Sequence, residues 1–175
     1  VHVNDVEYNY NRVQELLTQS LAENPDIIVL PETWNTGFHP SDDLITIADR
    51  NGERTKSLLT AFAKEHNVNI VGGSVAVAKD DLVFNTSYAY NREGTLVGEY
   101  SKMHGFSPAK EDKYFANGTH TTHFELDGIP CSTVICYDIR FPELVRMAAL
   151  PDTELLFVPA QWPTMRLRHW QVLNE

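Results

Sequence analysis

The chain has 175 residues, 42% of them hydrophobic, which suits one domain with a sizeable core and gives no sign of disorder. Its 24 acidic and 14 basic residues give a formal net charge of -10. That charge argues against nucleic acid and anionic membranes as partners, because either would need a basic patch. No apolar stretch approaches the ~20 residues of a membrane span, and we expect no signal peptide before Val1.

The cysteines and histidines bear on location and metal binding. Cys131 and Cys136 lie five residues apart on one predicted strand, so they do not easily close a disulfide, and we expect a reducing, cytoplasmic location. His120 and His123 have a spacing that a metal could use. They lie in a polar turn without nearby partners, so we expect a solvated loop and no metal.

The first third of the chain predicts helix, strand, helix. Apolar residues recur at helical spacing from Val6 to Leu21, and Asn24-Pro25 ends that helix. Residues 26–30 form a short apolar run between prolines, which is typical of a strand covered on both faces. A second helix is predicted over residues 53–66.

The rest of the chain predicts a mixed sheet with helices packed on it, an α/β fold. Three strands joined by turns short enough for antiparallel hairpins are predicted over residues 69–78, 82–90 and 95–100. The elements predicted after them are a hairpin of strands 122–126 and 129–135, a helix from Pro142, a strand over 154–159 and a helix from about Met165.

Three predicted strands end on reactive side chains: Glu32, Lys102 and Cys136. A strand end holds a residue rigidly, and the turn into the helix at Pro142 would present the thiol to a cleft. In a partly desolvated cleft, Glu32 could accept the thiol proton as sulfur attacks a carbonyl. Lys102 and the backbone N–H of Tyr137 could then stabilise the oxyanion. The set predicts an acyl-transfer site.

Each of these residues also has an ordinary interpretation. A carboxylate after a strand is often a helix cap, and a lysine there is usually on the surface. A Cys–His dyad using His104 or His169 is a rival, but it would leave the glutamate and the lysine without a role, so we expect structural histidines. Cys131 has no charged neighbour and is predicted to be a small packing residue.

Three segments resemble, in order and spacing, the signature segments of the nitrilase superfamily of carbon–nitrogen hydrolases: Leu-Pro-Glu32, Tyr-Ser-Lys102-Met-His104 and Ile-Cys136-Tyr-Asp-Ile-Arg-Phe-Pro-Glu. The likeness extends to Val-Gly-Gly-Ser74, Phe-Asn-Thr86, Pro-Ala-Gln-Trp-Pro163 and Arg-His-Trp170. The resemblance implies that Glu32 is the general base, Lys102 the oxyanion-stabilising cation and Cys136 the nucleophile.

The family also carries a second glutamate, between its lysine and its cysteine, that positions the substrate or the lysine. The resemblance places it at Glu111, with Asp112 as the alternative. Residues 105–109 depart from the more apolar stretch that the family shows there, so a solvated loop around Glu111 stays open.

Within the superfamily, the segment around Cys136 and Ala-Gln-Trp-Pro163 is most similar to the omega-amidase group. That likeness implies hydrolysis of the terminal amide of a small 2-oxo-acid amide. Tyr137, Arg140 and Trp162 are then expected to bind substrate, with Arg140 facing a carboxylate.

Other roles for the aromatic residues and for Arg140 remain open. Arg140 could instead form a structural ion pair with Asp138. Trp162 could belong to the core or to a dimer interface. Trp34 and Phe38 could line the pocket entrance or anchor their loop.

The resemblance implies a four-layer α-β-β-α sandwich formed by one domain over residues 1–175, with the first strand and the C-terminal third of the family lacking. It also implies a homodimer, a small-molecule amide substrate, a thioester acyl-enzyme, and no cofactor or metal. The alternatives are another branch of the superfamily (a nitrilase, a carbamoyl-amide hydrolase or a deaminated-glutathione amidase) and a non-catalytic fragment.

Overall fold

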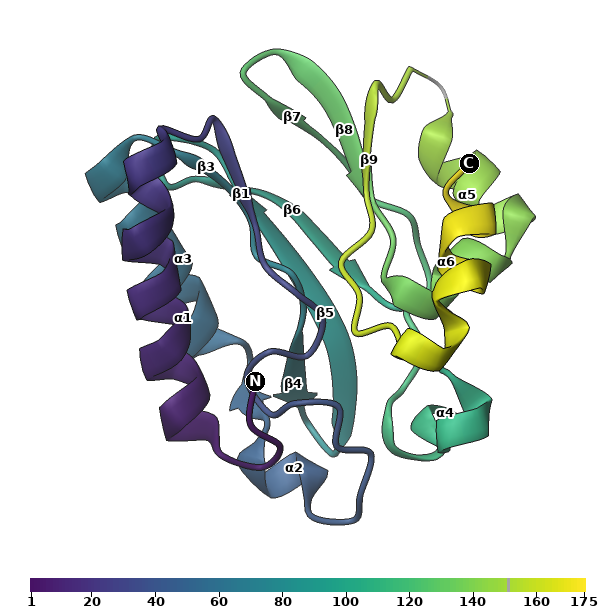
Figure 1. Cartoon of the computed structure of the whole chain (residues 1–175). Coiled ribbons are helices and arrows are strands. Elements are labelled where there is room, and N and C mark those ends of the chain that lie inside the picture. The colour runs from purple at the N-terminus through teal and green to yellow at the C-terminus, as the bar shows by residue number, and fades with distance from the viewer. Residues whose placement is uncertain (151) are drawn as a thin grey trace.

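The computed structural model describes residues 1–150 and 152–175, and it confirms the α/β class (Figure 1). A six-stranded sheet and a three-stranded sheet lie next to each other. Helices α1 (Val6–Ser20) and α3 (Glu53–His66) cover the outer face of the larger sheet. Helices α5 (Pro142–Ala149) and α6 (Leu167–Leu173) lie on the far side of the smaller sheet.

The larger sheet is mixed, as predicted. Its strands are β1 (Ile27–Val29), β2 (Asp49–Arg50), β3 (Asn69–Val71), β4 (Val75–Lys79), β5 (Leu82–Tyr90) and β6 (Leu96–Ser101). Strand β5 pairs antiparallel with β3 and β4 along one edge and with β6 along the other. The pairs β1–β3 and β2–β4 are parallel.

The predicted strand over residues 69–78 is wrong in one respect, because Gly72-Gly73-Ser74 divides it into β3 and β4. Gly73 has φ +62°, and a Cβ there would lie 2.1 Å from the carbonyl oxygen of Pro31. The break lets the chain after β1 approach closely, and the N–H of Ser74 donates to that same oxygen at 3.0 Å. The residues at the break between β3 and β4 therefore hold the segment that carries Glu32 in place.

The prediction that residues 26–30 are covered on both faces is also wrong. Strand β1 lies at the edge of the sheet and pairs with β3 alone. Ile28 is buried beneath the helices, but the side chain of Val29 is 47% exposed. The smaller sheet covers Ile27 and does not extend over Val29.

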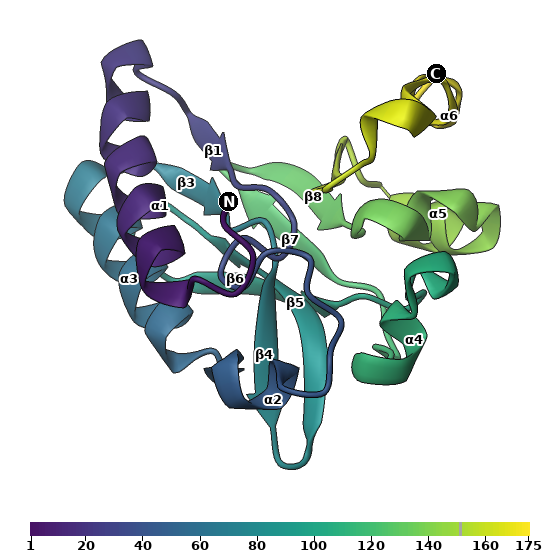
Figure 2. The same ribbon diagram turned by 60° about the horizontal axis from the view of Figure 1, so that its bottom comes forward.

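The smaller sheet consists of β7 (His123–Leu126), β8 (Ile129–Thr133) and β9 (Leu155–Phe157). Strand β7 is antiparallel to β8, and β9 is parallel to it, with α5 in the connection. The turned view shows α5 and α4 (Glu111–Tyr114) on the same side of the molecule (Figure 2). Strand β8 ends two residues before the predicted Ile135, and the chain then turns into the short helix η3 (Cys136–Arg140).

The elements that periodicity missed are all short. They are β2, α2 (Leu44–Ile47), α4, and the 3-10 turns η1 (Leu21–Glu23), η2 (Ser107–Ala109), η3 and η4 (Thr164–Arg166). Elements of two to five residues contain at most about one helical repeat or one strand alternation, so they have no pattern to detect.

Apolar side chains fill both faces of the larger sheet. On the helical side, Tyr10, Leu17 and Leu59 pack against Ile70 and Tyr88. Between the sheets lie Val71, Ala89, Phe124, Leu126 and Cys131. Cys131 is 1% exposed in this cluster, which confirms that it is a packing residue. The two sheets therefore hold a fixed position relative to each other, and the segments that follow β1, β6 and β8 come together.

Candidate active site

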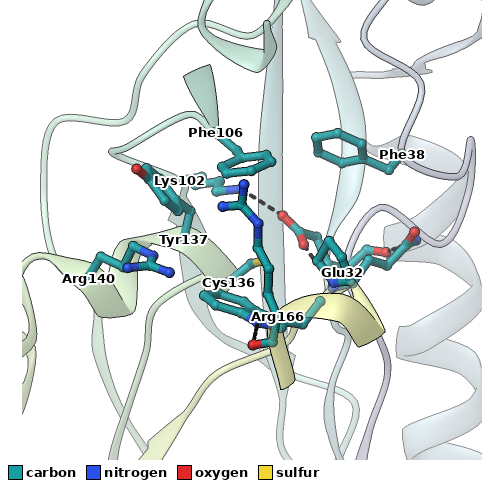
Figure 3. Close-up of a pocket in the computed structure, with 11 residues that line it drawn as sticks. Glu32, Phe38, Lys102, Phe106, Cys136, Tyr137, Arg140 and Arg166 are labelled. Atoms are coloured by element: carbon teal, nitrogen blue, oxygen red, sulfur yellow. Dashed lines mark hydrogen bonds and ion pairs between the residues drawn. The ribbon is translucent and has the colours of Figure 1, made fainter. Parts of the chain in front are cut away.

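Glu32, Lys102 and Cys136 line one cavity of about 380 Å³ (Figure 3). Glu32 lies in the loop after β1, Lys102 directly follows β6, and Cys136 opens η3 after β8. All three side chains are buried. The structure therefore brings together the three residues predicted from the strand ends.

Cys136 lies at a strained corner of the backbone. Its φ is +48°, a region that residues other than glycine seldom adopt. The backbone N–H of Cys136 donates to the carbonyl of Pro159 at 2.9 Å, which fixes the turn against the loop after β9. Thr33, beside the predicted base, also has a positive φ of +40°. Strained backbone of this kind persists only where the surrounding structure imposes it, and it is frequent at functional sites.

Lys102 lies between two buried carboxylates. Its Nζ is 2.7 Å from Oε1 of Glu32 and 2.8 Å from Oε2 of Glu111. Neither glutamate has exposed side-chain surface, so the solvated-loop interpretation of Glu111 is wrong. Asp112 is exposed and lines a different surface depression. The alternative that Asp112 takes the place of Glu111 as the second acidic residue of the site is therefore wrong. One ammonium between two carboxylates leaves one formal negative charge at the bottom of the cavity.

These neighbours determine the protonation of the amine and the thiol. Burial by itself lowers the pKa of Lys102, but the carboxylates of Glu32 and Glu111 more than offset it, so the pKa lies above its ordinary value. Burial, and then the charge of Glu32, raise the pKa of Cys136. The lysine is therefore charged, and the thiol keeps its proton until a base accepts it.

Two residues that hold Glu32 in place were not predicted. Nδ2 of Asn85, on β5, donates to Oε1 of Glu32 and to Oε1 of Glu111, both at 3.1 Å. The backbone N–H of Gln161 donates to Oε2 of Glu32 at 2.9 Å, and its Nε2 donates to the carbonyl of Glu32 at 2.5 Å. Both residues lie in segments that carry the family resemblance, and that was the only signal in the sequence.

Glu111 is held by the loop that departs from the family pattern. The backbone N–H of Phe106 donates to Oε2 of Glu111 at 2.6 Å. The ring of Phe106 lines the cavity and lies edge-on to the ring of Tyr137, 5.0 Å away. The unusual loop thus contributes both a carboxylate contact and an aromatic wall.

Asp138, two residues after the thiol, fixes η3 from beneath. It accepts hydrogen bonds from the hydroxyl of Tyr100 at 2.8 Å, the N–H of Ile135 at 3.0 Å and the N–H of His104 at 2.9 Å. The ion pair between Asp138 and Arg140 that we considered is therefore wrong. His104 also contacts Asp138 through Nδ1 at 3.1 Å, which confirms its structural hydrogen-bonding role.

All three predicted substrate-binding residues line the cavity. Tyr137, Arg140 and Trp162 are partly exposed there. The backbone N–H of Tyr137 has no acceptor among the described residues, whereas the amides of Cys136 and Asp138 on either side are bonded. That N–H is free to serve as the second oxyanion donor.

The two aromatic residues after Glu32 have different positions. Phe38 lines the cavity, as expected for an entrance residue. Trp34 is completely buried, packs edge-on against Tyr10, and donates from Nε1 to the carbonyl of Gly72 at 2.9 Å. Of the two roles left open for Trp34, the structure supports the loop anchor and contradicts the entrance residue.

The geometry favours a Glu–Lys–Cys set over a Cys–His dyad. His169 contacts Arg140 at 3.0 Å, His104 stacks on Phe141, and neither histidine is among the residues that line the cavity. The charged groups that act on the thiol are Glu32 and Lys102. A nucleophile, a base and a cation in one cavity are the components of covalent acyl transfer.

Within residues 1–150 and 152–175, no group of three or more His, Cys, Asp or Glu side chains could hold a metal ion. His120 and His123 are both exposed. Every helix in these ranges is too short or too polar to span a bilayer.

The chain is similar in sequence to known proteins. The family model for carbon-nitrogen hydrolases matches residues 2–175. A 2-oxoglutaramate amidase of Bacillus subtilis (strain 168) is 42% identical over 159 residues, which cover 91% of this chain and 61% of that protein. The omega-amidase NIT2 of Danio rerio is 28% identical, covering 100% of this chain and 66% of that protein.

A solved structure agrees with the fold. A carbon-nitrogen hydrolase superfamily protein of Xanthomonas campestris superposes with a TM-score of 0.86 at 28% sequence identity, over 99% of this chain and 66% of its own. The chain thus spans slightly less than two thirds of the length of these relatives.

Proposed function

Because the chain belongs to the carbon-nitrogen hydrolase family, we propose that the protein is an amidase with Cys136 as its nucleophile. The observation that carries the proposal is the shared cavity, in which a buried thiol lies beside a carboxylate that a lysine holds in place. The names of two relatives, a 2-oxoglutaramate amidase and an omega-amidase, support small 2-oxo-acid amides as substrates.

In the proposed reaction the thiol transfers its proton to Glu32 as sulfur bonds to the amide carbon. Lys102 and the N–H of Tyr137 stabilise the negative oxygen that forms. The carbon–nitrogen bond then breaks, and ammonia leaves with the proton from Glu32. Water attacks the thioester, gives a proton to Glu32, and releases the carboxylic acid while sulfur recovers its proton.

The raised pKa of Cys136 supports a base-assisted attack over a preformed thiolate. A thiol that is protonated at neutral pH needs an acceptor at the moment of bond formation. Glu32 is suited to this role because Lys102, Asn85 and Gln161 fix both of its carboxylate oxygens. The base therefore stays in place through both half-reactions.

Replacing the nucleophile tests the proposal. We expect Cys136→Ala to lower ammonia release from a 2-oxo-acid amide by about 10⁴-fold or more, because a residue that forms the covalent bond has no substitute in the cavity. The matched control is Cys131→Ala, which removes the other thiol from the interface between the sheets and leaves turnover near that of the parent. Circular dichroism verifies that both variants are folded.

A mass spectrum of the protein during turnover of a slow amide distinguishes the intermediate. The proposal predicts an added acyl group on the peptide that contains Cys136. Ammonia release that survives in Cys136→Ala would refute the nucleophile. The homodimer stays a prediction from the resemblance, and the cytoplasmic location stays a prediction from the two cysteines.

A further inference from the structure

Two arginines at the substrate cavity have no carboxylate partner in the described part of the chain. Arg140 and Arg166 both line the cavity. Arg12, Arg54 and Arg92 each form an ion pair with an acidic side chain, whereas Arg50, Arg146 and Arg168 form none among the described residues. What distinguishes Arg140 and Arg166 from those three is that they line the cavity that holds Cys136, where their free charge can act on a substrate.

Arg166 extends from η4 across the cavity toward Phe106 (Figure 3). Its Cζ lies 5.3 Å from the centroid of the Phe106 ring. Its backbone is fixed at both ends, since its N–H donates to the carbonyl of Pro163 at 2.8 Å and its carbonyl accepts from Nε1 of Trp162 at 2.9 Å. A cation–π contact restrains a guanidinium without using its N–H groups, so those donors remain available.

Arg140 is restrained in a similar way. Its Nη2 lies 3.0 Å from Nδ1 of His169. An arginine has no acceptor, so this contact requires an unprotonated Nδ1 on the histidine. The Cζ of Arg140 also lies 5.6 Å from the centroid of the Trp162 ring. No acidic side chain among the described residues forms an ion pair with Arg140.

The charges divide the cavity into two zones. At the bottom, Lys102 is matched by Glu32 and Glu111, and one negative charge remains. At the rim, Arg140 and Arg166 are partly exposed and positive. A negatively charged substrate group is repelled from the bottom and attracted to the rim, while the amide must reach Cys136 at the bottom.

We propose that Arg166 is a specificity-determining residue, which selects amides that carry a carboxylate at the end remote from the scissile bond. The inference rests on the proposed amidase function and names the residue that recognises the substrate's anionic end. A guanidinium can hold a carboxylate through two parallel N–H donors, and a neutral amide of the same length leaves these donors unpaired. Arg140 supplies the second positive group at the same rim.

The kinetic test compares two amides of one chain length. The substrates are the monoamide of glutaric acid and pentanamide, which lacks the carboxylate. We expect Arg166→Gln to lower the ratio of kcat/KM for the anionic amide to kcat/KM for the neutral one by about 10–100-fold, mainly through KM. Arg166→Lys, which keeps the charge and loses the fork, should give an intermediate ratio.

The matched control is Arg168→Gln, two residues further on. Arg168 is exposed and is not among the residues that line the cavity, so its loss should leave the ratio as in the parent. If Arg166 serves only to pack on Phe106, Arg166→Gln will slow both amides equally. The ratio of the two kcat/KM values would then stay as in the parent, and that result overturns the inference. The proposed amidase function is judged separately, from ammonia release by the parent.

A binding measurement separates the inference from turnover. In the Cys136→Ala background, calorimetry gives the Kd of the glutaric monoamide, and we expect added Arg166→Gln to raise it at least ~10-fold. Added Arg168→Gln should not change it. If the parent releases ammonia from neither of these amides nor from a 2-oxo-acid amide, the proposed function fails. Equal Kd values with and without the Arg166 side chain would overturn the inference alone.

Discussion

At the scale of single residues, Asn85 is the neutral group that lets two carboxylates share one lysine. Glu32 and Glu111 both approach Nζ of Lys102, so each lies close to the other's negative charge. The amide of Asn85 donates to Oε1 of both glutamates without adding charge. Two carboxylates buried this close to each other need such donors, although Oδ1 of Asn85 itself has no hydrogen-bond partner among the described residues.

Asn85→Asp tests this role of the amide. The substitution replaces the shared donor by a third carboxylate in a buried site, and we expect the free energy of unfolding to fall by about 3 kcal/mol or more at pH 7. Asn117→Asp makes the same chemical change at an exposed position and should alter stability by less than about 0.5 kcal/mol. Urea denaturation of both variants measures the difference. Equal stabilities would contradict the role assigned to Asn85.

At the scale of elements, the site depends on corners where a strand stops. Cys136 adopts a positive φ three residues past the end of β8, and Thr33 adopts one in the loop after β1. Gly73 adopts φ +62° where β3 gives way to β4. The Gly73 corner also lets the N–H of Thr33 donate to the hydroxyl of Ser74 at 2.9 Å. The break in the sheet and the position of Glu32 are therefore one feature.

Gly73→Ala should damage that corner. Its Cβ would meet the carbonyl of Pro31 at 2.1 Å and would require a strained φ, so we expect a loss of about 2–5 kcal/mol in the free energy of unfolding. Gly128→Ala is the control, because Gly128 has φ +79° but nothing within 4 Å of its Cβ, and its cost should be about 1–2 kcal/mol. Urea denaturation tests this order. A smaller loss in Gly73→Ala than in Gly128→Ala would show that the close approach is unimportant.

At the scale of the whole molecule, burial of the thiols couples stability to pH. Burial raises the pKa of Cys136, and it also raises the pKa of Cys131 between the sheets. The folded protein therefore holds these protons at pH values where the unfolded chain, with thiol pKa values of about 8.5, releases them. Stability from this source is complete below about pH 8.5 and is lost as the pH rises.

We expect the free energy of unfolding to fall between pH 8.5 and 10, by at most about 1.4 kcal/mol per pH unit for each thiol. Lys102 and the buried tyrosines have raised pKa values as well, but their unfolded-state values of about 10 or more place their effect above this window. In Cys136→Ser the slope should be shallower. Denaturation curves in reducing buffer at several pH values provide the test, and an unchanged slope would argue against a buried, protonated thiol.

The amino-acid sequence was sufficient to predict the residues whose setting is local. Glu32, Lys102 and Cys136 each follow a predicted strand, and a strand's end can be located from the run of residues that precedes it. The resemblance added Glu111, although the loop around it departs from the family pattern. The α/β class could be predicted as well, because the alternation of strands and helices along the chain is visible in local patterns of apolar residues.

The tertiary structure alone decided which distant groups meet. Gln161 bonds Glu32 across 129 residues, Asn85 bonds it across 53, and Trp34 is buried by contacts with Tyr10 and Gly72. Arg166 reaches the cavity from a three-residue turn that has no periodicity. Sequence patterns record which face of its own element a residue occupies, whereas these contacts depend on how separate elements pack, and that is fixed only when the two sheets close on each other.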